Sequence, residues 1–180
     1  MKYISLLRGI NISGKNKITM SELKKEFTNL GYKEVITYLN SGNVVFKSDI
    51  EDKNVIKNNI QIMIKDKFGF DIPTYVTTSQ ELEELISHSP EWWGKDNKEI
   101  YDNIIFIIPP TTYNEVFDTI GSPNEYEKIQ DYKNNIFWSF SFKNYRKSNW
   151  WSKTANTNIS DKITIRTANT MRKILEICKR

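Results

Sequence analysis

The fold is set by one stretch of the sequence, Thr37-Tyr38-Leu39-Asn40-Ser41-Gly42-Asn43-Val44-Val45-Phe46. β-Branched and aromatic residues, which favour strands, lie on both sides of a short polar segment. The Asn and Gly residues of that segment supply the positive φ angles that a tight turn requires. The pattern predicts two strands, at 34–39 and 43–46, that pair as a hairpin.

One helix and one strand are expected on each side of this hairpin. Before it, Thr19-Met20-Ser21-Glu22 matches a capping box and predicts a helix that ends at Gly31. After it, the segment 52–68 has the apolar spacing of a helix. Short apolar runs at 3–7 and 72–77 predict the two outer strands. The resulting order, β-α-β-β-α-β, is typical of the ferredoxin-like fold.

The second half of the chain predicts the same order again. The expected elements are a helix at 79–87, a strand at 104–108, a helix from 112, strands at 125–132 and 136–142, a partly helical basic segment at 145–156, a strand at 162–166 and a helix at 167–179. We therefore predict an α+β protein of two ferredoxin-like units, with antiparallel sheets and helices packed on them. The N-terminal unit is expected at 1–88 and the C-terminal unit, with its terminal helix, at 103–180, joined by a connector at 89–102.

The composition excludes several classes of protein. The 180 residues include one Cys and one His, so no disulfide framework, Cys-based zinc site or multi-His metal site is expected. No apolar run approaches the roughly 20 residues of a membrane-spanning helix. The first residues carry charge too early for a signal peptide. We expect a soluble, cytoplasmic protein that uses no membrane, metal or cofactor, and the composition specifies no oligomeric state.

The net charge of +4 is unevenly distributed along the chain. Residues 1–33 hold seven Lys and Arg against two Asp and Glu, and residues 143–180 hold ten against two. The middle of the chain holds nine against eighteen. If the fold brings the two basic ends together, one basic face results. The alternative is that these Lys-rich segments are ordinary solvated helix faces.

The first candidate binding segment runs from Arg8 to Lys17 and connects a strand end to a helix N-terminus. Unpaired backbone N–H groups at such a junction favour an anion. We predict anion contacts from Arg8, Asn11, Lys15, Asn16 and Lys17. Gly9 to Lys15 matches the start of a P-loop, but Asn16 stands where a hydroxyl residue would hold Mg²⁺. The alternative is a polar connecting loop.

The hairpin tip is the second candidate segment. We predict that Asn40, Ser41 and Asn43 form a rigid tip that presents amide groups beside the first loop. The alternative is that these residues serve only the turn, because Asn and Gly are the residues that a hairpin needs.

The third candidate segment is the basic block near the C-terminus. Tyr145-Arg146-Lys147 and Trp150-Trp151-Ser152-Lys153 interleave basic and aromatic residues, which can pair with phosphates and stack on bases. The predicted anion contacts here come from Lys153, Arg166, Thr167 and Asn169. The alternative for Trp150-Trp151, and for Trp92-Trp93, is packing between the two halves.

No catalytic apparatus is visible, and the catalytic residues of any reaction stay unassigned. His88 lies at a predicted helix end without a Ser or Asp motif near it, so a capping or solvated role is expected. Cys178 falls on the apolar face of the last helix and is expected in the core. Motifs of nucleophilic, metal-dependent and dinucleotide-binding enzymes are absent from the sequence.

Three motifs of the chain resemble those of a widespread, largely bacterial family, the domain of unknown function number 1697 (DUF1697). They are Leu6-Leu7-Arg8-Gly9-Ile10-Asn11 with Gly14-Lys15-Asn16-Lys17 and Met20-Ser21-Glu22-Leu23, the hairpin stretch 37–46, and Ile163-Thr164-Ile165-Arg166-Thr167 with Asn169-Thr170 and Lys173. The resemblance covers nearly the whole chain and implies a cytoplasmic protein with a ferredoxin-like α+β fold, without an assigned activity. Ser13 departs from the family pattern where Gly is frequent, and Ala168 where Trp is frequent.

Three functions are compatible with these observations. The first is a binding module for nucleic acid or a nucleotide-like anion, by analogy with ferredoxin-like RNA-binding domains, although the aromatic motif of those domains is absent. The second is an enzyme that acts on a phosphorylated small molecule and uses Arg8, Lys15, Lys17 and Arg166 to position charge. The third is a structural or protein-interaction role, which would expose the Trp92-Trp93 and Trp150-Trp151 pairs.

Overall fold

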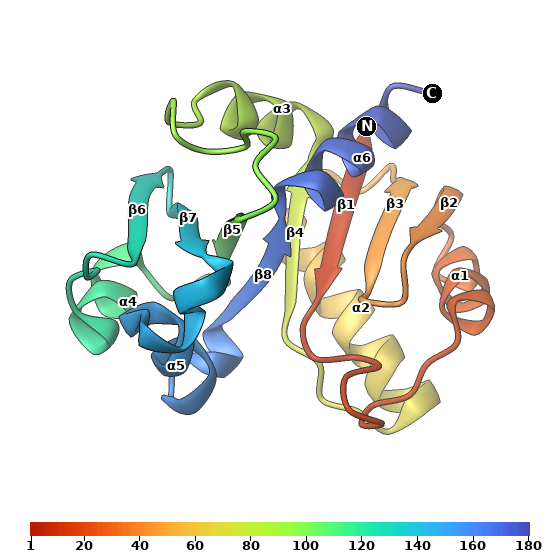
Figure 1. The fold of residues 1–180 in the computed structure, drawn as a ribbon. Helices are drawn as coiled ribbons and strands as arrows, with labels where there is room; N and C mark the ends of the chain where they lie inside the picture. The colour runs from red at the N-terminus through yellow and green to blue at the C-terminus, as the bar shows by residue number, and fades with distance from the viewer. The chain divides into compact units, whose positions relative to one another are not determined.

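A computed structural model describes residues 1–180. The chain forms two compact units, Met1–Glu83 with Ile174–Arg180, and Glu84–Lys173. Each unit holds one four-stranded antiparallel sheet (Figure 1). The prediction places units at 1–88 and 103–180, with a single boundary between them at the connector 89–102. The units of the structure divide the chain in two places, because the last turns of the C-terminal helix belong to the first unit.

The first unit has the strand order β2-β3-β1-β4, with antiparallel pairing throughout. This is the order of the ferredoxin-like fold, in which the first and third strands occupy the centre. Its elements are β1 (Lys2–Leu7), α1 (Met20–Asn29), β2 (Lys33–Tyr38), β3 (Asn43–Lys47), α2 (Lys53–Phe68), β4 (Thr74–Thr78) and the start of α3 (Ser79–Ser87).

The hairpin between β2 and β3 forms as predicted. Tyr38 pairs with Asn43, and the Asn43 side chain donates to the Tyr38 carbonyl at 2.9 Å. Gly42 has a φ of +78°, and a Cβ at this position would lie 2.7 Å from the Cβ of Leu7. Only Gly satisfies both the positive φ and the close approach to β1.

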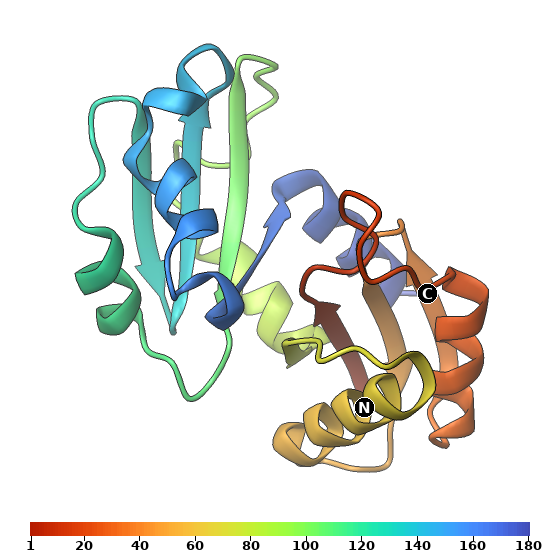
Figure 2. The same cartoon turned by 90° about the horizontal axis from the view of Figure 1, so that it is seen from below.

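Helices α1 and α2 cover one face of the first sheet (Figure 2). Thr19 and Glu22 form the predicted capping box at the start of α1. Phe46 of β3 lies 5.4 Å from the ring of Phe27 and 4.5 Å from that of Tyr32. The other buried residues of this core come from α1, α2 and the facing side of the sheet, and include Leu23, Val44, Ile56, Ile60 and Ile64.

The last turns of α6 (Ala168–Cys178) lie against the opposite face of the first sheet. Lys2 of β1 donates from Nζ to the carbonyl of Cys178 at 2.9 Å, and Lys179 pairs with Glu83 at 2.7 Å. Ile177 and Cys178 are buried. The first and last residues of the chain are therefore neighbours, so the basic N-terminal segment meets the end of the basic C-terminal segment in this unit.

The second unit repeats the topology of the first, with the strand order β6-β7-β5-β8. The α+β fold of two ferredoxin-like units is thereby confirmed. Its elements are β5 (Ile100–Ile107), α4 (Tyr113–Ile120), β6 (Glu127–Tyr132), β7 (Asn135–Ser141), the 3₁₀ helix η1 (Phe142–Lys147), α5 (Asn149–Asn156), the 3₁₀ helix η2 (Ser160–Lys162), β8 (Ile163–Thr167) and the start of α6.

Trp138 and Trp150 are the largest side chains in the core of the second unit, which lies between its sheet and helices α4 and α5 (Figure 2). Trp150 is fully buried and donates from Nε1 to the Gly121 carbonyl at 3.1 Å. This corrects the expectation that Trp150 packs between the halves, because α5 crosses over the sheet of its own unit.

Trp93 packs on the other face of the second sheet. Its ring lies 5.1 Å from that of Phe137, and its Nε1 donates to the Asn103 carbonyl at 2.8 Å. Arg172 of α6 lies over the indole at 5.7 Å and donates to the Gly94 carbonyl at 2.5 Å. These contacts fix the irregular segment 90–97 to the second unit.

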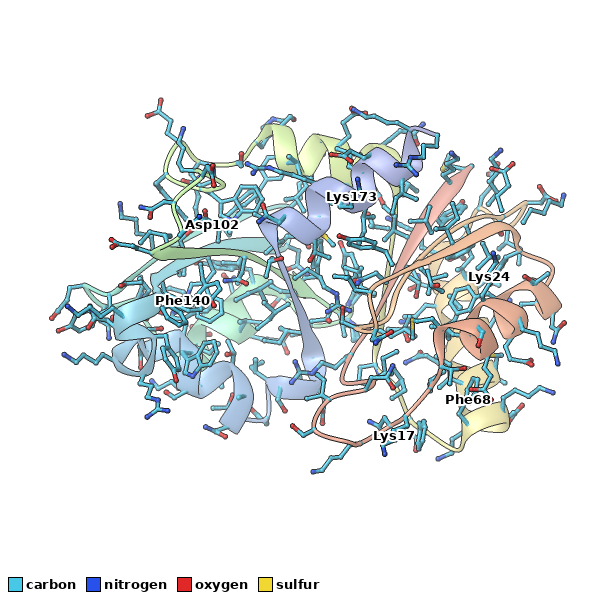
Figure 3. All side chains as sticks on the ribbon, turned by 45° about the vertical axis from the view of Figure 1, so that its right-hand side comes forward. Lys17, Lys24, Phe68, Asp102, Phe140 and Lys173 are labelled. Atoms are coloured by element: carbon cyan, nitrogen blue, oxygen red, sulfur yellow. The ribbon has the colours of Figure 1, made fainter.

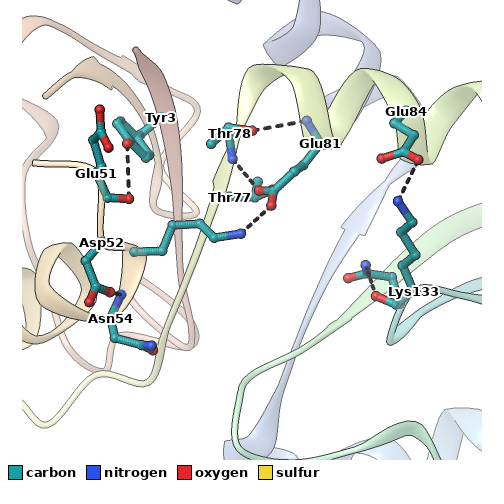
Figure 4. A network of polar contacts seen from close by, with 11 residues as sticks. Tyr3, Glu51, Asp52, Asn54, Thr77, Thr78, Glu81, Glu84 and Lys133 are labelled. Carbon is teal, nitrogen blue, oxygen red and sulfur yellow. Dashed lines mark hydrogen bonds and ion pairs between the residues drawn. The ribbon is translucent and has the colours of Figure 1, made fainter.

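Both units begin a helix directly after their last strand. In the first unit, Thr78 and Glu81 form a reciprocal capping box at the start of α3, the helix predicted at 79–87 (Figure 4). In the second, the Thr170 amide donates to the Thr167 hydroxyl at the start of α6. None of the helices combines the length and apolar character needed to cross a bilayer.

Candidate nucleic-acid interface

The loop 8–17 and the hairpin tip lie side by side, as predicted. Asn11 joins them, since its Nδ2 donates to the Asn40 carbonyl at 2.9 Å and to the Ile18 carbonyl at 2.8 Å. Its Oδ1 accepts from the Ile18 amide at 2.9 Å. The amide group of Asn11 is therefore engaged inside the fold, on both its donor and its acceptor side.

Two further predicted ligand-binding amides also have intramolecular partners. Asn16 donates to the Gly9 carbonyl at 3.0 Å, and Asn43 donates to the Tyr38 carbonyl and the Ser41 hydroxyl. These bonds hold a loop whose backbone has positive φ at Gly9, Asn11, Ser13, Gly14 and Asn16. Much of the Asn content of this segment thus maintains the shape of the loop.

The predicted basic residues of this loop differ in exposure. Lys15 is exposed on the loop, and so is Lys17 (labelled in Figure 3). Arg8 is half-buried, and its backbone amide donates to the Pro73 carbonyl at 2.9 Å. Asn40 and Ser41 are exposed at the hairpin tip. The first unit therefore places its two candidate segments side by side, joined by the hydrogen bond from Asn11 to Asn40.

The four predicted residues of the second unit are spread over three elements. Lys153 of α5 donates to the Ile120 carbonyl at 2.7 Å, at the C-terminal end of α4, where a cation is favoured. Arg166 of β8 is buried and donates to the Thr164 hydroxyl and the Ile165 carbonyl, each at 2.8 Å. Thr167 caps α6. Asn169 is exposed in the first turn of that helix.

An exposed aromatic surface lies where β5, η1 and α5 meet. We define it as Tyr101, Phe142, Tyr145 and Trp151, of which Tyr101 is 44% exposed, Phe142 54% and Trp151 43%. The rings form a continuous series, with centroid distances of 5.3 Å from Tyr101 to Phe142, 6.3 Å from Phe142 to Tyr145 and 4.8 Å from Tyr145 to Trp151. Phe140, buried on β7 (Figure 3), supports Tyr101 and Trp151 from below.

Three cations accompany the aromatic surface. Arg146 lies 5.5 Å above the ring of Tyr145 and donates to its hydroxyl at 2.8 Å. Lys147 lies 5.4 Å above the ring of Tyr126, and Lys143 is exposed on the same short helix. The surface therefore combines flat apolar rings with positive charge.

A buried carboxylate holds this surface in place. Glu127 of β6 accepts hydrogen bonds from the indole Nε1 of Trp138 at 3.1 Å and from the Ser148 hydroxyl at 2.6 Å. It also accepts from the backbone amides of Asn149 and Trp150, at 2.8 and 3.1 Å. A negative charge at the N-terminus of α5 is favourable. Glu127 thereby fixes the junction of η1 and α5 to the sheet.

Sequence reasoning found part of the aromatic surface and missed the rest. Tyr145, Arg146 and Trp151 belonged to the predicted basic block, but Tyr101 and Phe142 did not. The pairing of β5 with β7 places Tyr101 opposite Phe140, two residues from Phe142. The only signal in the sequence was an aromatic residue, Tyr101, just before the apolar run 104–108. Trp93 and Trp150 are buried, so two of the four tryptophans expected on a protein-interaction surface are in the interior.

The single histidine takes part in packing. His88 stacks on Tyr132 at 4.4 Å, and its Nδ1 lies 2.9 Å from the Glu84 carbonyl. Hydrogen bonds from Lys133 (Figure 4) and from Tyr132 lower the pKa of Glu84. The structure groups no three His, Cys, Asp or Glu side chains in a way that could hold a metal ion.

Comparison with known proteins places these features in a family context. Residues 1–137 match the family model described as "Protein of unknown function (DUF1697)". Among solved structures, the conserved bacterial protein SP0830 from Streptococcus pneumoniae matches with a TM-score of 0.86 and 31% identity, and the match covers 98% of each chain. None of the curated proteins matches the chain.

Proposed function

The chain belongs to the DUF1697 family, a family of unknown function, and from this premise we propose that it binds single-stranded nucleic acid on the aromatic surface of its second unit. The observation that carries the proposal is the series of rings from Tyr101 to Trp151, of which Tyr145 is half-buried and the other three are exposed, together with the cations of η1. Proteins that bind single strands combine the same two features, stacking platforms and a basic path for the backbone.

Exposed aromatic rings favour a single strand over a duplex. Every unpaired base has a flat face that can stack on Phe142 or Trp151, whereas the bases of a duplex are stacked on each other. Rings that are supported by neighbours lose little conformational freedom on binding. Phe140 gives this support to Trp151, and Tyr145 lies between Phe142 and Trp151.

The cations supply contacts to phosphate. Lys143, Arg146 and Lys147 lie on one short 3₁₀ helix, and all three are exposed. Contacts of this kind carry no sequence information, so we expect binding with little sequence preference. With about three phosphates neutralised, the logarithm of the affinity for a single strand falls with a slope of about −2 against the logarithm of the salt concentration.

Fluorescence anisotropy of labelled oligonucleotides tests the proposal. We expect a 20-residue oligothymidylate or oligouridylate to bind more tightly than a duplex of equal length. Phe142→Ala and Trp151→Ala each reduce affinity by roughly 5- to 100-fold, the loss of one stacked base. Lys143→Ala reduces the salt slope by roughly 0.7.

Matched controls lie on α2 of the first unit. Ile62 is 60% exposed and Lys67 is exposed, so Ile62→Ala and Lys67→Ala remove similar groups far from the aromatic surface in sequence. Both controls keep the affinity of the unmodified chain. Equal affinity for duplex and single strand, or binding that does not change with salt, contradicts the proposal.

A further inference from the structure

A groove of about 510 Å³ opens on the first unit, away from the loop 8–17 and the hairpin tip. Its lining comes from five parts of the chain. They are β1 with Lys2, α1 with Lys24, the edge strand β2 with Ile36, β3 with Val45, and the end of the chain with Ile177 and Arg180. The volume lies within the range of sites that hold small molecules.

A bulge in the edge strand forms one side of this groove. Lys33 pairs with Lys47 and Ile36 pairs with Val45, so two residues of β2 stand opposite one residue of β3. Glu34, within the bulge, has a φ of +52°. A bulge bends its strand and re-aims its side chains, and bulges are frequent next to functional sites.

The floor of the groove is apolar. Ile36 is 40% exposed on the edge strand, whereas its neighbour Val35 is buried. Val45 and Ile177 are buried and complete the floor. An aliphatic chain placed here would remove the side chain of Ile36 from water, which is favourable.

The rim of the groove is strongly basic. Four cationic side chains line it, Lys2, Lys24, Lys47 and Arg180, against one acidic side chain, Glu34. Lys47 pairs with Glu34, and Lys2 donates to the Cys178 carbonyl. Lys24 of α1 (Figure 3) and Arg180 hold no ion pair, so they are the cations available to an anionic ligand.

We propose that this groove binds a small amphiphilic anion, with a carboxylate or phosphate head between Lys24 and Arg180 and a short aliphatic chain on Ile36, Val45 and Ile177. The planar guanidinium of Arg180 matches the two oxygens of either head. The site is on the first unit and is independent of the nucleic-acid proposal, because the residues of the aromatic surface take no part in it.

Isothermal titration calorimetry on the full chain tests the site with four eight-carbon probes. Octanoate and octyl phosphate carry different anionic head groups. Octylammonium reverses the charge of the head group, and 1-octanol removes it. We expect one saturating site for octanoate, octyl phosphate or both, and the tighter of the two identifies the head. Octylammonium and 1-octanol bind at least tenfold more weakly.

Variants locate the site on the chain. Arg180→Gln and Lys24→Gln each weaken the better anion about tenfold, and Ile36→Ser weakens it severalfold. Lys67→Gln and Ile62→Ser, which alter an exposed Lys and an exposed Ile on α2, leave the affinity unchanged. The proposal is overturned if octylammonium binds as tightly as the anions, or if the α2 control variants lose as much affinity as the groove variants. It is also overturned if binding of the anions does not saturate by 1 mM.

Discussion

The carboxylate of Glu127 accepts a hydrogen bond from the indole Nε1 of Trp138 at 3.1 Å, inside the second unit. The same carboxylate accepts from the hydroxyl of Ser148 and from the first backbone amides of α5. One buried acid therefore connects the sheet to the helix that carries Trp151. The geometry of the aromatic surface depends on this connection.

Glu127→Gln should destabilise the protein. The substitution places an NH₂ group against donors that need an acceptor, which leaves buried polar groups unsatisfied and costs about 2 kcal/mol. The free energy of unfolding, measured by urea denaturation, gives this cost. Glu125→Gln, two residues away and exposed, serves as the control and should change stability by less than about 0.5 kcal/mol. Equal effects in the two variants would show that the Glu127 carboxylate carries no special role.

Asn11→Ala should destabilise the first unit. It removes one hydrogen bond to the Asn40 carbonyl of the hairpin and two hydrogen bonds with the backbone of Ile18, and it places Ala at a φ of +54°. Together these losses amount to about 2–3 kcal/mol of unfolding free energy. Ser13→Gly should have the opposite effect and raise the unfolding free energy by up to about 1 kcal/mol. Ser13 has a φ of +50°, which Gly adopts without strain. Stabilisation by Asn11→Ala would contradict the structural role of the Asn11 side chain.

The hairpin could be predicted from sequence because its signals are local. Gly42 lies between strand-forming residues, and each half of the pair is close to the other along the chain. The helix starts at Thr19 and Thr112 were predictable for the same reason, since a capping box spans only four residues. The order of elements then indicated the topology of both units.

The sites were harder to predict because the same residue types serve ligands and backbone alike. The side-chain amides of Asn11 and Asn16 suit an anion, but in the fold they donate to carbonyls of their own loop and its neighbours. Tyr101 joins Phe142 only through the register of β5 and β7, which the sequence does not encode locally. Glu127 looked like an ordinary strand residue because its role depends on where α5 begins.

Ser5→Ala should stabilise the protein by about 1 kcal/mol. The hydroxyl of Ser5 is fully buried on β1 and has no hydrogen-bond partner, so folding removes it from water without compensation. Thr74→Val on the neighbouring β4 is the matched comparison, because the Thr74 hydroxyl is equally buried but donates to the Ile72 carbonyl at 3.0 Å. That variant should lose stability. Thermal denaturation of both variants measures the contrast, and a loss of stability in Ser5→Ala would refute the argument.

Cys178 should react slowly with thiol reagents in the native protein. Burial raises the pKa of the Cys178 thiol to about 11, and the charge of Lys2 offsets this only in part. At pH 8 about one thiol in a thousand is the reactive thiolate. Alkylation by iodoacetamide, followed by mass spectrometry, should accelerate about tenfold for each pH unit from 8 to 10. A rate that levels off near pH 9, as for an exposed thiol, would count against the buried position.

Glu81 should make the stability of the first unit sensitive to acid. Burial acts to raise the pKa of this carboxyl, but hydrogen bonds from Lys53, the Thr78 amide and the Thr77 hydroxyl outweigh it and lower the pKa below its usual value of 4.5. A carboxyl whose pKa is lowered by folding stabilises the protein above its unfolded pKa, and this contribution is lost as pH falls through the folded pKa. Glu81→Gln should therefore reduce the unfolding free energy at pH 7 and have a smaller effect at pH 3.

Urea denaturation of the Glu81 variant and the unmodified chain across this pH range measures the effect. Glu91→Gln, at an exposed position, provides the control for the loss of one negative charge. The difference between the unmodified chain and Glu81→Gln should narrow below pH 4.5, whereas the Glu91→Gln difference should stay small at every pH. A Glu81→Gln difference that is constant from pH 7 to pH 3 would mean that the ionised carboxylate does not stabilise the start of α3, and that the capping box acts through its neutral hydrogen bonds alone.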